Sequence, residues 1–155
     1  MGAVYDGYYG DSAISLIVGP DIQAANRLID VTRGALLTGI KNAILGVHLG
    51  NVSSAIQKYV EASGFNVVRK FVGHGIGRAL HEPPEVPNYG EIGSGPVLKE
   101  GMALAIEPMV NAGGPDVRVL EDGWTVVTVD DSLSAHFEHT IAITAKGPEI
   151  LSQPY

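Results

Sequence analysis

The stretch SAHFEHTIAIT, residues 134–144, alternates polar and apolar side chains over most of its length. Successive side chains of a β-strand point to opposite faces, so this alternation predicts the closing strand of a sheet. Glu138 then shares one face with His136 and Thr140. Phe137 and Ile141 point the other way. A carboxylate inside a strand of this kind marks its face as a candidate functional surface.

A second stretch with the same property precedes it. GMALAIEPMV, residues 101–110, predicts a strand in which Glu107 shares its face with Ala103 and Ala105. Those small side chains leave space beside the carboxylate. Pro108 favours an extended conformation for the residue before it, which keeps Glu107 in the strand.

The rest of the chain predicts a single α+β domain over residues 1–155, because two helices come early and antiparallel strands with long loops come later. The N-terminal segment 3–18 reads as a hairpin with a tight Asp6–Gly7 turn. Helical spacing covers 21–40, and a second helix runs from an Asn51 cap to Gly64. The remaining predicted elements are a strand over 65–73, a loop region over 73–101 and a hairpin over 116–130 around Asp122–Gly123.

Composition narrows the classes of function. A chain of 155 residues with 45% hydrophobic and 17% charged side chains is typical of a globular domain. The net charge of −7 argues against nucleic acid and acidic membrane surfaces as partners. There is no cysteine, and hence neither a disulfide nor a thiolate nucleophile. No apolar run reaches membrane-spanning length, so we expect a cytoplasmic location.

Four polar residues stand where burial is expected. They are Asp11, His74, Glu107 and Glu138. Taken singly, each has an ordinary interpretation, as a solvated strand-face acid or as a loop histidine. Taken together, three carboxylates and one imidazole on small-residue faces would repel one another without a cation. This hard ligand set favours Mn²⁺, Fe²⁺ or Co²⁺ and also suits Zn²⁺.

Longer motifs carry a family resemblance. GHGIGRALHEPPEVPNYG, LKEGMALAIEPMVNAG, DGWTVVTVDDSLSAHFEHTIAIT and YDGYYGDSA resemble type I methionine aminopeptidases, over almost the whole chain and in order. The resemblance implies the pita-bread metallopeptidase fold, with a curved, antiparallel-rich sheet and two helices on one side. A proline-specific peptidase of the same fold is the rival within the family, and the first and third motifs fit it less well.

The resemblance also implies roles for individual residues. It makes Glu107 and His81 catalytic, and it places His81, Leu80 and Trp124 against the substrate. The implied metal ligands are Asp11, His74, Glu107 and Glu138. The implied activity is metal-dependent removal of N-terminal methionine from peptides and nascent chains.

The family site has a further aspartate that would fall before residue 1, so the resemblance predicts a C-terminal part that lacks an N-terminal segment. From this we expect one retained metal site, a second site that is lost, and reduced or absent activity. An exposed sheet edge would then favour self-association. The alternatives are an inactive metal-binding remnant and an oligomerising fragment that needs a separate N-terminal half. The role of His136 stays open.

Overall fold

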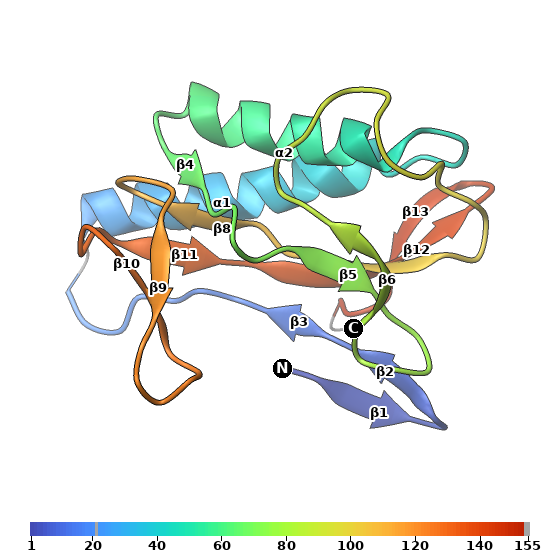
Figure 1. Cartoon of the computed structure of the whole chain (residues 1–155), viewed down its shortest axis with the longest axis horizontal. Helices are drawn as coiled ribbons and strands as arrows, with labels where there is room; N and C mark the ends of the chain where they lie inside the picture. The colour runs from blue at the N-terminus through green and yellow to red at the C-terminus, as the bar shows by residue number, and fades with distance from the viewer. Residues whose placement is uncertain (21, 154–155) are drawn as a thin grey trace.

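The computed structural model describes residues 1–20 and 22–153 and places two helices on one side of a curled antiparallel sheet (Figure 1). The N-terminal hairpin lies on the opposite side of that sheet (Figure 1). This arrangement confirms the predicted α+β class and the position of the helices. The two faces of the sheet therefore have different neighbours, and the helices cover only one of them.

The N-terminal hairpin forms where the sequence predicts it. Strands β1 (Ala3–Tyr5) and β2 (Tyr8–Gly10) pair in antiparallel fashion. Asp6 and Gly7 connect them with φ values of 48° and 78°. Two consecutive left-handed residues are typical of the two-residue hairpin turn that an Asp-Gly sequence favours. Strand β3 (Ser12–Ala13) follows directly.

Helix α1 (Gln23–Asn42) packs an apolar stripe against the sheet. It confirms the helix predicted over 21–40, although Asp21 itself lies outside the described residues. The buried positions recur at intervals of three and four residues, as expected for one helix face. They are Leu28, Thr32, Ala35, Leu36, Gly39 and Ile40.

Helix α2 (Leu49–Ala62) lies beside α1 and begins earlier than predicted. The expected role of Asn51 as its N-cap is wrong, because His48 occupies that position. The Asn51 side chain instead accepts a hydrogen bond from the N–H of Gly93 at 2.8 Å. The Asn51 side chain, which the local sequence pattern predicted to cap the helix, thus binds a loop from a distant part of the chain.

The main sheet has the strand order β13-β12-β7-β5-β6, and β3 pairs with β12. These strands are β5 (Gly73–Gly75), β6 (Glu82–Val86), β7 (Ala103–Ile106), β12 (Glu138–Thr144) and β13 (Gly147–Ile150). A second sheet has the order β11-β8-β4, with β4 (Asn66–Val67), β8 (Met109–Asn111) and β11 (Ser134–His136). Strands β9 (Val117–Val119) and β10 (Val126–Thr128) form the predicted hairpin around Asp122–Gly123.

Several predicted boundaries are wrong. The stretch 65–73 is not one strand, and the expected loop 73–101 contains β5 and β6. Strand β6 includes Pro83 and Pro84. The sheet tolerates these prolines because β6 is an edge strand, where a missing N–H donor does not interrupt pairing with a further strand. The predicted strands 101–110 and 134–144 are each divided, around Glu107–Pro108 and at Phe137. Pro108 has no N–H and so interrupts the ladder.

One register nevertheless runs through both interruptions. Ile106 stands opposite His139, and three residues further Met109 stands opposite His136. Phe137 donates its N–H to the carbonyl of Pro108 at 3.3 Å between these pairs. By this register Glu107 lies opposite Glu138. The two sheets are thus continuous at the point where both carboxylates stand.

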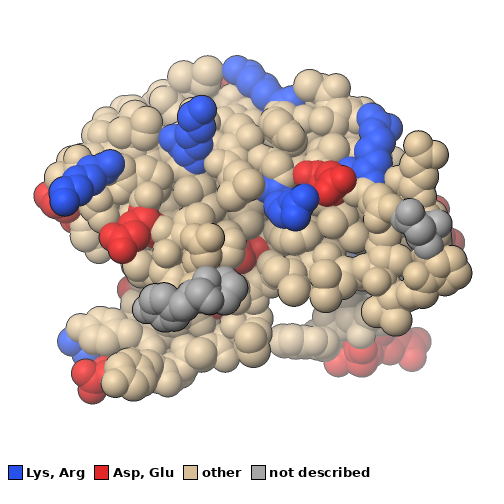
Figure 2. Space-filling model, turned by 180° about the vertical axis from the view of Figure 1, so that it is seen from behind, with Lys and Arg blue, Asp and Glu red and all other residues tan. Residues whose placement is uncertain are grey.

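The core lies between the sheet and the helices, where the buried side chains of β7 and β12 include Leu104, Ile106 and Ile141. None of the described helices is long and apolar enough to cross a membrane. On the face seen in Figure 2, the Lys and Arg side chains are scattered, and several of them lie beside Asp or Glu side chains.

Gly73 tests the packing of strand β5, which lies between β7 and β6. A Cβ atom there would lie 2.3 Å from the carbonyl oxygen of Ala105 and 3.2 Å from Val86. We expect Gly73→Ala to lower the free energy of unfolding by roughly 1–3 kcal/mol, because overpacking displaces a backbone. Urea unfolding measures this loss. Gly10→Ala is the control, since nothing lies within 4 Å of its Cβ position; equal stability of the two variants would contradict the packing described.

Candidate metal centre

The floor of the site is one row of residues across three strands. His74 on β5 stands opposite Ala105 on β7, and Ala105 stands opposite Thr140 on β12. Directly opposed residues of an antiparallel sheet project to the same face, so these three side chains share the face turned away from the helices. The methyl group of Ala105 occupies little of the space between its neighbours. The small side chain predicted from the sequence therefore opens room for polar groups.

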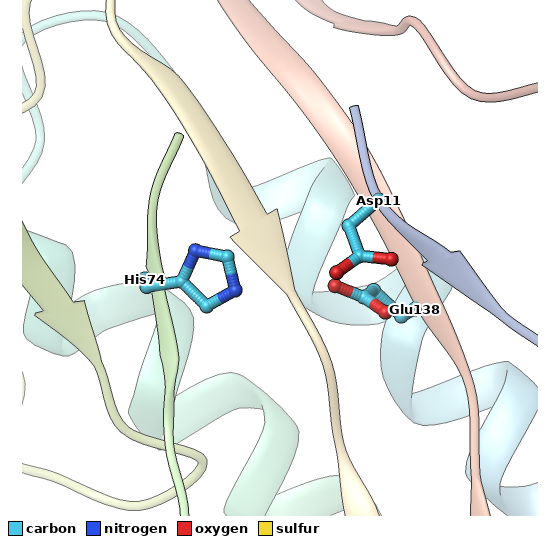
Figure 3. A group of neighbouring side chains, drawn as sticks. All are labelled: Asp11, His74 and Glu138. Atoms are coloured by element: carbon cyan, nitrogen blue, oxygen red, sulfur yellow. The ribbon is translucent and has the colours of Figure 1, made fainter. Parts of the chain in front are cut away.

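Three of the four predicted ligands converge over this floor. Asp11, His74 and Glu138 each offer a ligand atom, and these atoms all lie within 4.8 Å of one another. Figure 3 shows the Asp11 and Glu138 carboxylates side by side, with the His74 ring facing them. The three residues come from the segment between β2 and β3, from β5 and from the start of β12. The cluster is thus assembled entirely by tertiary structure.

The hydrogen bonding of His74 determines which ring nitrogen faces the carboxylates. Its Nδ1 lies 2.9 Å from the carbonyl oxygen of Gly75. A carbonyl oxygen only accepts, so Nδ1 is the donor, and in the neutral ring the lone pair is then on Nε2. Nε2 lies 3.4 Å from Oε1 of Glu107. The free lone pair is on the nitrogen that faces the acidic cluster, as a metal-ligating histidine requires.

Glu138 is the most deeply buried carboxylate of the site, with 4% of its surface exposed. Burial raises its pKa to about 7, and repulsion from Glu107 and Asp11 adds to the shift. Burial and the two neighbouring carboxylates both disfavour the ionised form of Glu138, and the positive groups nearby do not offset them. In the folded protein, Glu138 therefore stays protonated at pH values where an ordinary glutamate is ionised.

Glu107, the fourth predicted ligand, stands at the edge of the cluster. Its Oε1 faces His74, and its Oε2 lies 3.5 Å from Nε2 of His136. His136 Nε2 is buried and makes no hydrogen bond. Sequence reasoning placed His136 on the correct face but assigned it no partner. Its position opposite Met109, diagonal to Glu107, supplies the contact.

A cleft of about 750 Å³ opens beside the cluster. His74, His81, Glu107 and His136 line its polar part. The apolar part of its lining includes Val68, Phe71, Val72, Met109, Val117 and Val126. An apolar cleft with a few convergent polar groups is the usual form of a small-ligand site.

Of the three residues predicted to contact the substrate, only His81 lies at the cleft. The ring of His81 packs edge-on against that of His74, with centroids 4.3 Å apart. Among the described residues, neither Leu80 nor Trp124 belongs to the lining of the cleft. Trp124 lies in the β9–β10 connection and is 88% exposed. The structure thus joins His81 to the cluster and leaves Trp124 in solvent.

The donor set fits a divalent cation. Two carboxylates and an imidazole offer three ligand atoms within 4.8 Å of one another, and the carboxylate of Glu107 lies next to His74 beside them. A bound cation would offset the repulsion between the carboxylates. Oxygen-rich sets with one imidazole suit the harder first-row metals and zinc.

Comparison with known proteins agrees with this geometry. A sequence profile of metallopeptidase family M24 matches residues 1–145. The chain is 53% identical over 151 residues to a protein of Clostridium perfringens named methionine aminopeptidase, covering 97% of this chain and 61% of that protein. The crystal structure of methionine aminopeptidase from Thermotoga maritima superimposes with a TM-score of 0.96 at 56% identity, covering 99% of this chain and 61% of the other.

The prolidase from Pyrococcus furiosus shares the fold alone, with a TM-score of 0.77 and 23% identity over 99% of this chain and 40% of the other. The chain spans about three fifths of the length of the more similar relatives.

The buried carboxyl of Glu138 makes the metal-free protein sensitive to pH. Its pKa is about 7 when folded and 4.5 in the ordinary state, so between these values the folded protein keeps a proton that the unfolded chain has released. The free energy of unfolding then falls as the pH rises, by on the order of 3 kcal/mol in total.

We expect Glu138→Gln to flatten this dependence, because an amide does not ionise. Denaturant unfolding of both proteins in chelator, at intervals from pH 5 to pH 8, measures the difference. It should favour the variant increasingly toward pH 8. Parallel pH profiles for the two proteins would contradict the raised pKa of Glu138.

Proposed function

The chain belongs to metallopeptidase family M24, and from that premise we propose that it acts in the metal-dependent removal of N-terminal methionine from peptides and nascent chains. The observation that carries the proposal is the convergence of Asp11, His74 and Glu138 beside Glu107. The similarity to proteins named methionine aminopeptidase supports the choice of substrate. Because those relatives are longer, the activity of this chain alone is part of the proposal.

We propose that Asp11, His74, Glu107 and Glu138 hold one divalent ion, which is Mn²⁺, Fe²⁺, Co²⁺ or Zn²⁺. The described residues contain a single group of this kind, which supports one tight site per chain. When bound, the cation supplies Lewis acidity that makes water a stronger acid and polarises the scissile carbonyl.

Glu107 is the proposed proton carrier. Its carboxylate is half-buried, faces the cleft and is held between His74 and His136. From there it takes a proton from the attacking water and returns it to the leaving amine. His81, which lines the same cleft, donates an imidazole N–H to the substrate oxygen as negative charge develops.

The cleft is the proposed binding place of the peptide N-terminus. Its apolar lining suits a thioether side chain, and its polar end adjoins the cluster. Contacts from Leu80 and Trp124 to the substrate stay predictions, as do the cytoplasmic location and the absence of nucleic-acid partners.

A second candidate function is self-association through the N-terminal segment. Ile14, Leu16 and Val18 alternate along it and are 68%, 75% and 98% exposed. An uncovered apolar row of this kind favours pairing with another chain. Sedimentation at several concentrations tests it, and a monomer throughout would contradict it.

Metal binding is the first test of the proposal. We expect one tight Mn²⁺ or Co²⁺ site in the wild-type chain by calorimetry. Asp11→Asn should weaken binding more than tenfold. Loss of a residue that only hydrogen-bonds to a metal ligand already lowers metal affinity by about 10–100-fold, and loss of a ligand should cost at least as much. Asp6→Asn is the matched control, because Asp6 lies in the hairpin turn. Two equal tight sites, or an equal effect of both variants, would contradict the assigned ligands.

Peptide cleavage is the second test. A peptide that begins Met-Gly, incubated with the metal-loaded protein, should release free methionine. Glu107→Gln should lower this rate by about 10²–10⁴-fold, as expected when a general acid–base group is removed. Chromatography of the released amino acid measures it. A rate unchanged by Glu107→Gln would assign proton transfer to another residue.

A further inference from the structure

Asp11 reaches the cluster by a short connection. It directly precedes β3, which pairs with β12 at two positions only, Ala13 opposite Glu138 and Ser12 opposite His139. By contrast, β7 and β12 pair at four positions. The carboxyl groups of Asp11 and Glu138 lie close together and form no ion pair with each other, so their contact does not hold the Asp11 segment to the sheet. A two-residue ladder needs additional contacts to hold it there.

The side chain of Thr140 supplies one such contact. Its hydroxyl accepts a hydrogen bond from the N–H of Asp11 at 2.8 Å and donates one to the carbonyl oxygen of Asp11, also at 2.8 Å. A hydroxyl has one donor and two lone pairs, so one Thr side chain satisfies both main-chain groups. Thr140 is 3% exposed, and Asp11 stands opposite it if the β3–β12 register is extended by one residue.

Ser15 makes the same arrangement at the other end of the ladder. Its hydroxyl accepts from the N–H of His136 and donates to the carbonyl oxygen of His136, both at 2.9 Å. Two side-chain hydroxyls thus bracket the β3–β12 pairing, where main-chain hydrogen bonds would otherwise continue it. The Thr140 bridge is the one that acts on a proposed ligand.

We propose that Thr140 is a positioning residue of the metal centre, whose hydroxyl fixes the main chain of Asp11 so that its carboxylate meets Glu138. The inference rests on the proposed metal site. The N–H of Ser12 then donates to Oδ1 of Asp11 at 2.9 Å and sets the rotation of the carboxylate. Thr140 itself bonds to the main chain of Asp11 and makes no hydrogen bond to its carboxylate oxygens.

Three variants test this role. Thr140→Val keeps the shape and removes the hydroxyl, Thr140→Ser keeps the hydroxyl, and Thr32→Val removes another buried hydroxyl in α1, which donates to the carbonyl of Leu28 at 2.7 Å. We expect Thr140→Val to weaken Mn²⁺ binding by about 10–100-fold. It should also accelerate hydrogen exchange of the Asp11 amide in the metal-free protein. Thr140→Ser and Thr32→Val should stay near wild type in both measurements.

The outcomes separate this inference from the proposed function. A wild-type chain that binds no Mn²⁺ overturns the metal site and the inference together. A wild-type chain that binds Mn²⁺, with Thr140→Val equal to it in affinity and in Asp11 exchange, overturns the inference alone. Equal losses in Thr140→Val and Thr32→Val overturn it as well, since general destabilisation then explains both. If Thr140→Val does not fold, a folded Thr140→Ser with weakened binding overturns it.

Discussion

The antiparallel register between β7–β8 and β11–β12 is the constraint on which the site depends. It is maintained through Pro108 and Phe137, although the main-chain ladder is interrupted there. Because the side-chain period of a strand is two, a shift of one residue would move Glu138 to the helix-facing core. The same shift would expose Ile141 to solvent. The apolar core thus fixes the register, and the register fixes the positions of Glu107 and Glu138.

That fixed geometry brings three acidic side chains together in a place that is largely shielded from solvent. Glu138 is desolvated and repelled by Glu107 and Asp11, which raises its pKa to about 7. A sequence selected for stability alone would place an apolar or hydrogen-bonded residue here. The arrangement is understandable for a binding site, since a cation bound only by the folded state turns this repulsion into affinity and stabilises the fold.

The sequence was informative where the relevant interactions are local or follow strand periodicity. The Asp6–Gly7 turn, the apolar stripe of α1 and the shared face of Glu138 and Thr140 all follow from short-range rules, and the structure confirms them. It was misleading where a distant segment decides the outcome. Asn51 binds a returning loop instead of capping its helix, and the prolines of β6 are accepted because that strand lies at an edge.

For the four predicted ligands too, local sequence identifies the residues, and distant segments decide their arrangement. Residue type and small neighbours identify candidates, but their convergence depends on pairings between residues far apart in the chain. Asp11 is joined to β12 by the two ladder pairs that follow it and by the hydroxyl of Thr140. A cation that uses Asp11 binds tightly only when this segment is docked on β12. In the proposed metal site, affinity for the cation and docking of the N-terminal segment are therefore thermodynamically linked, and each strengthens the other by the same free energy.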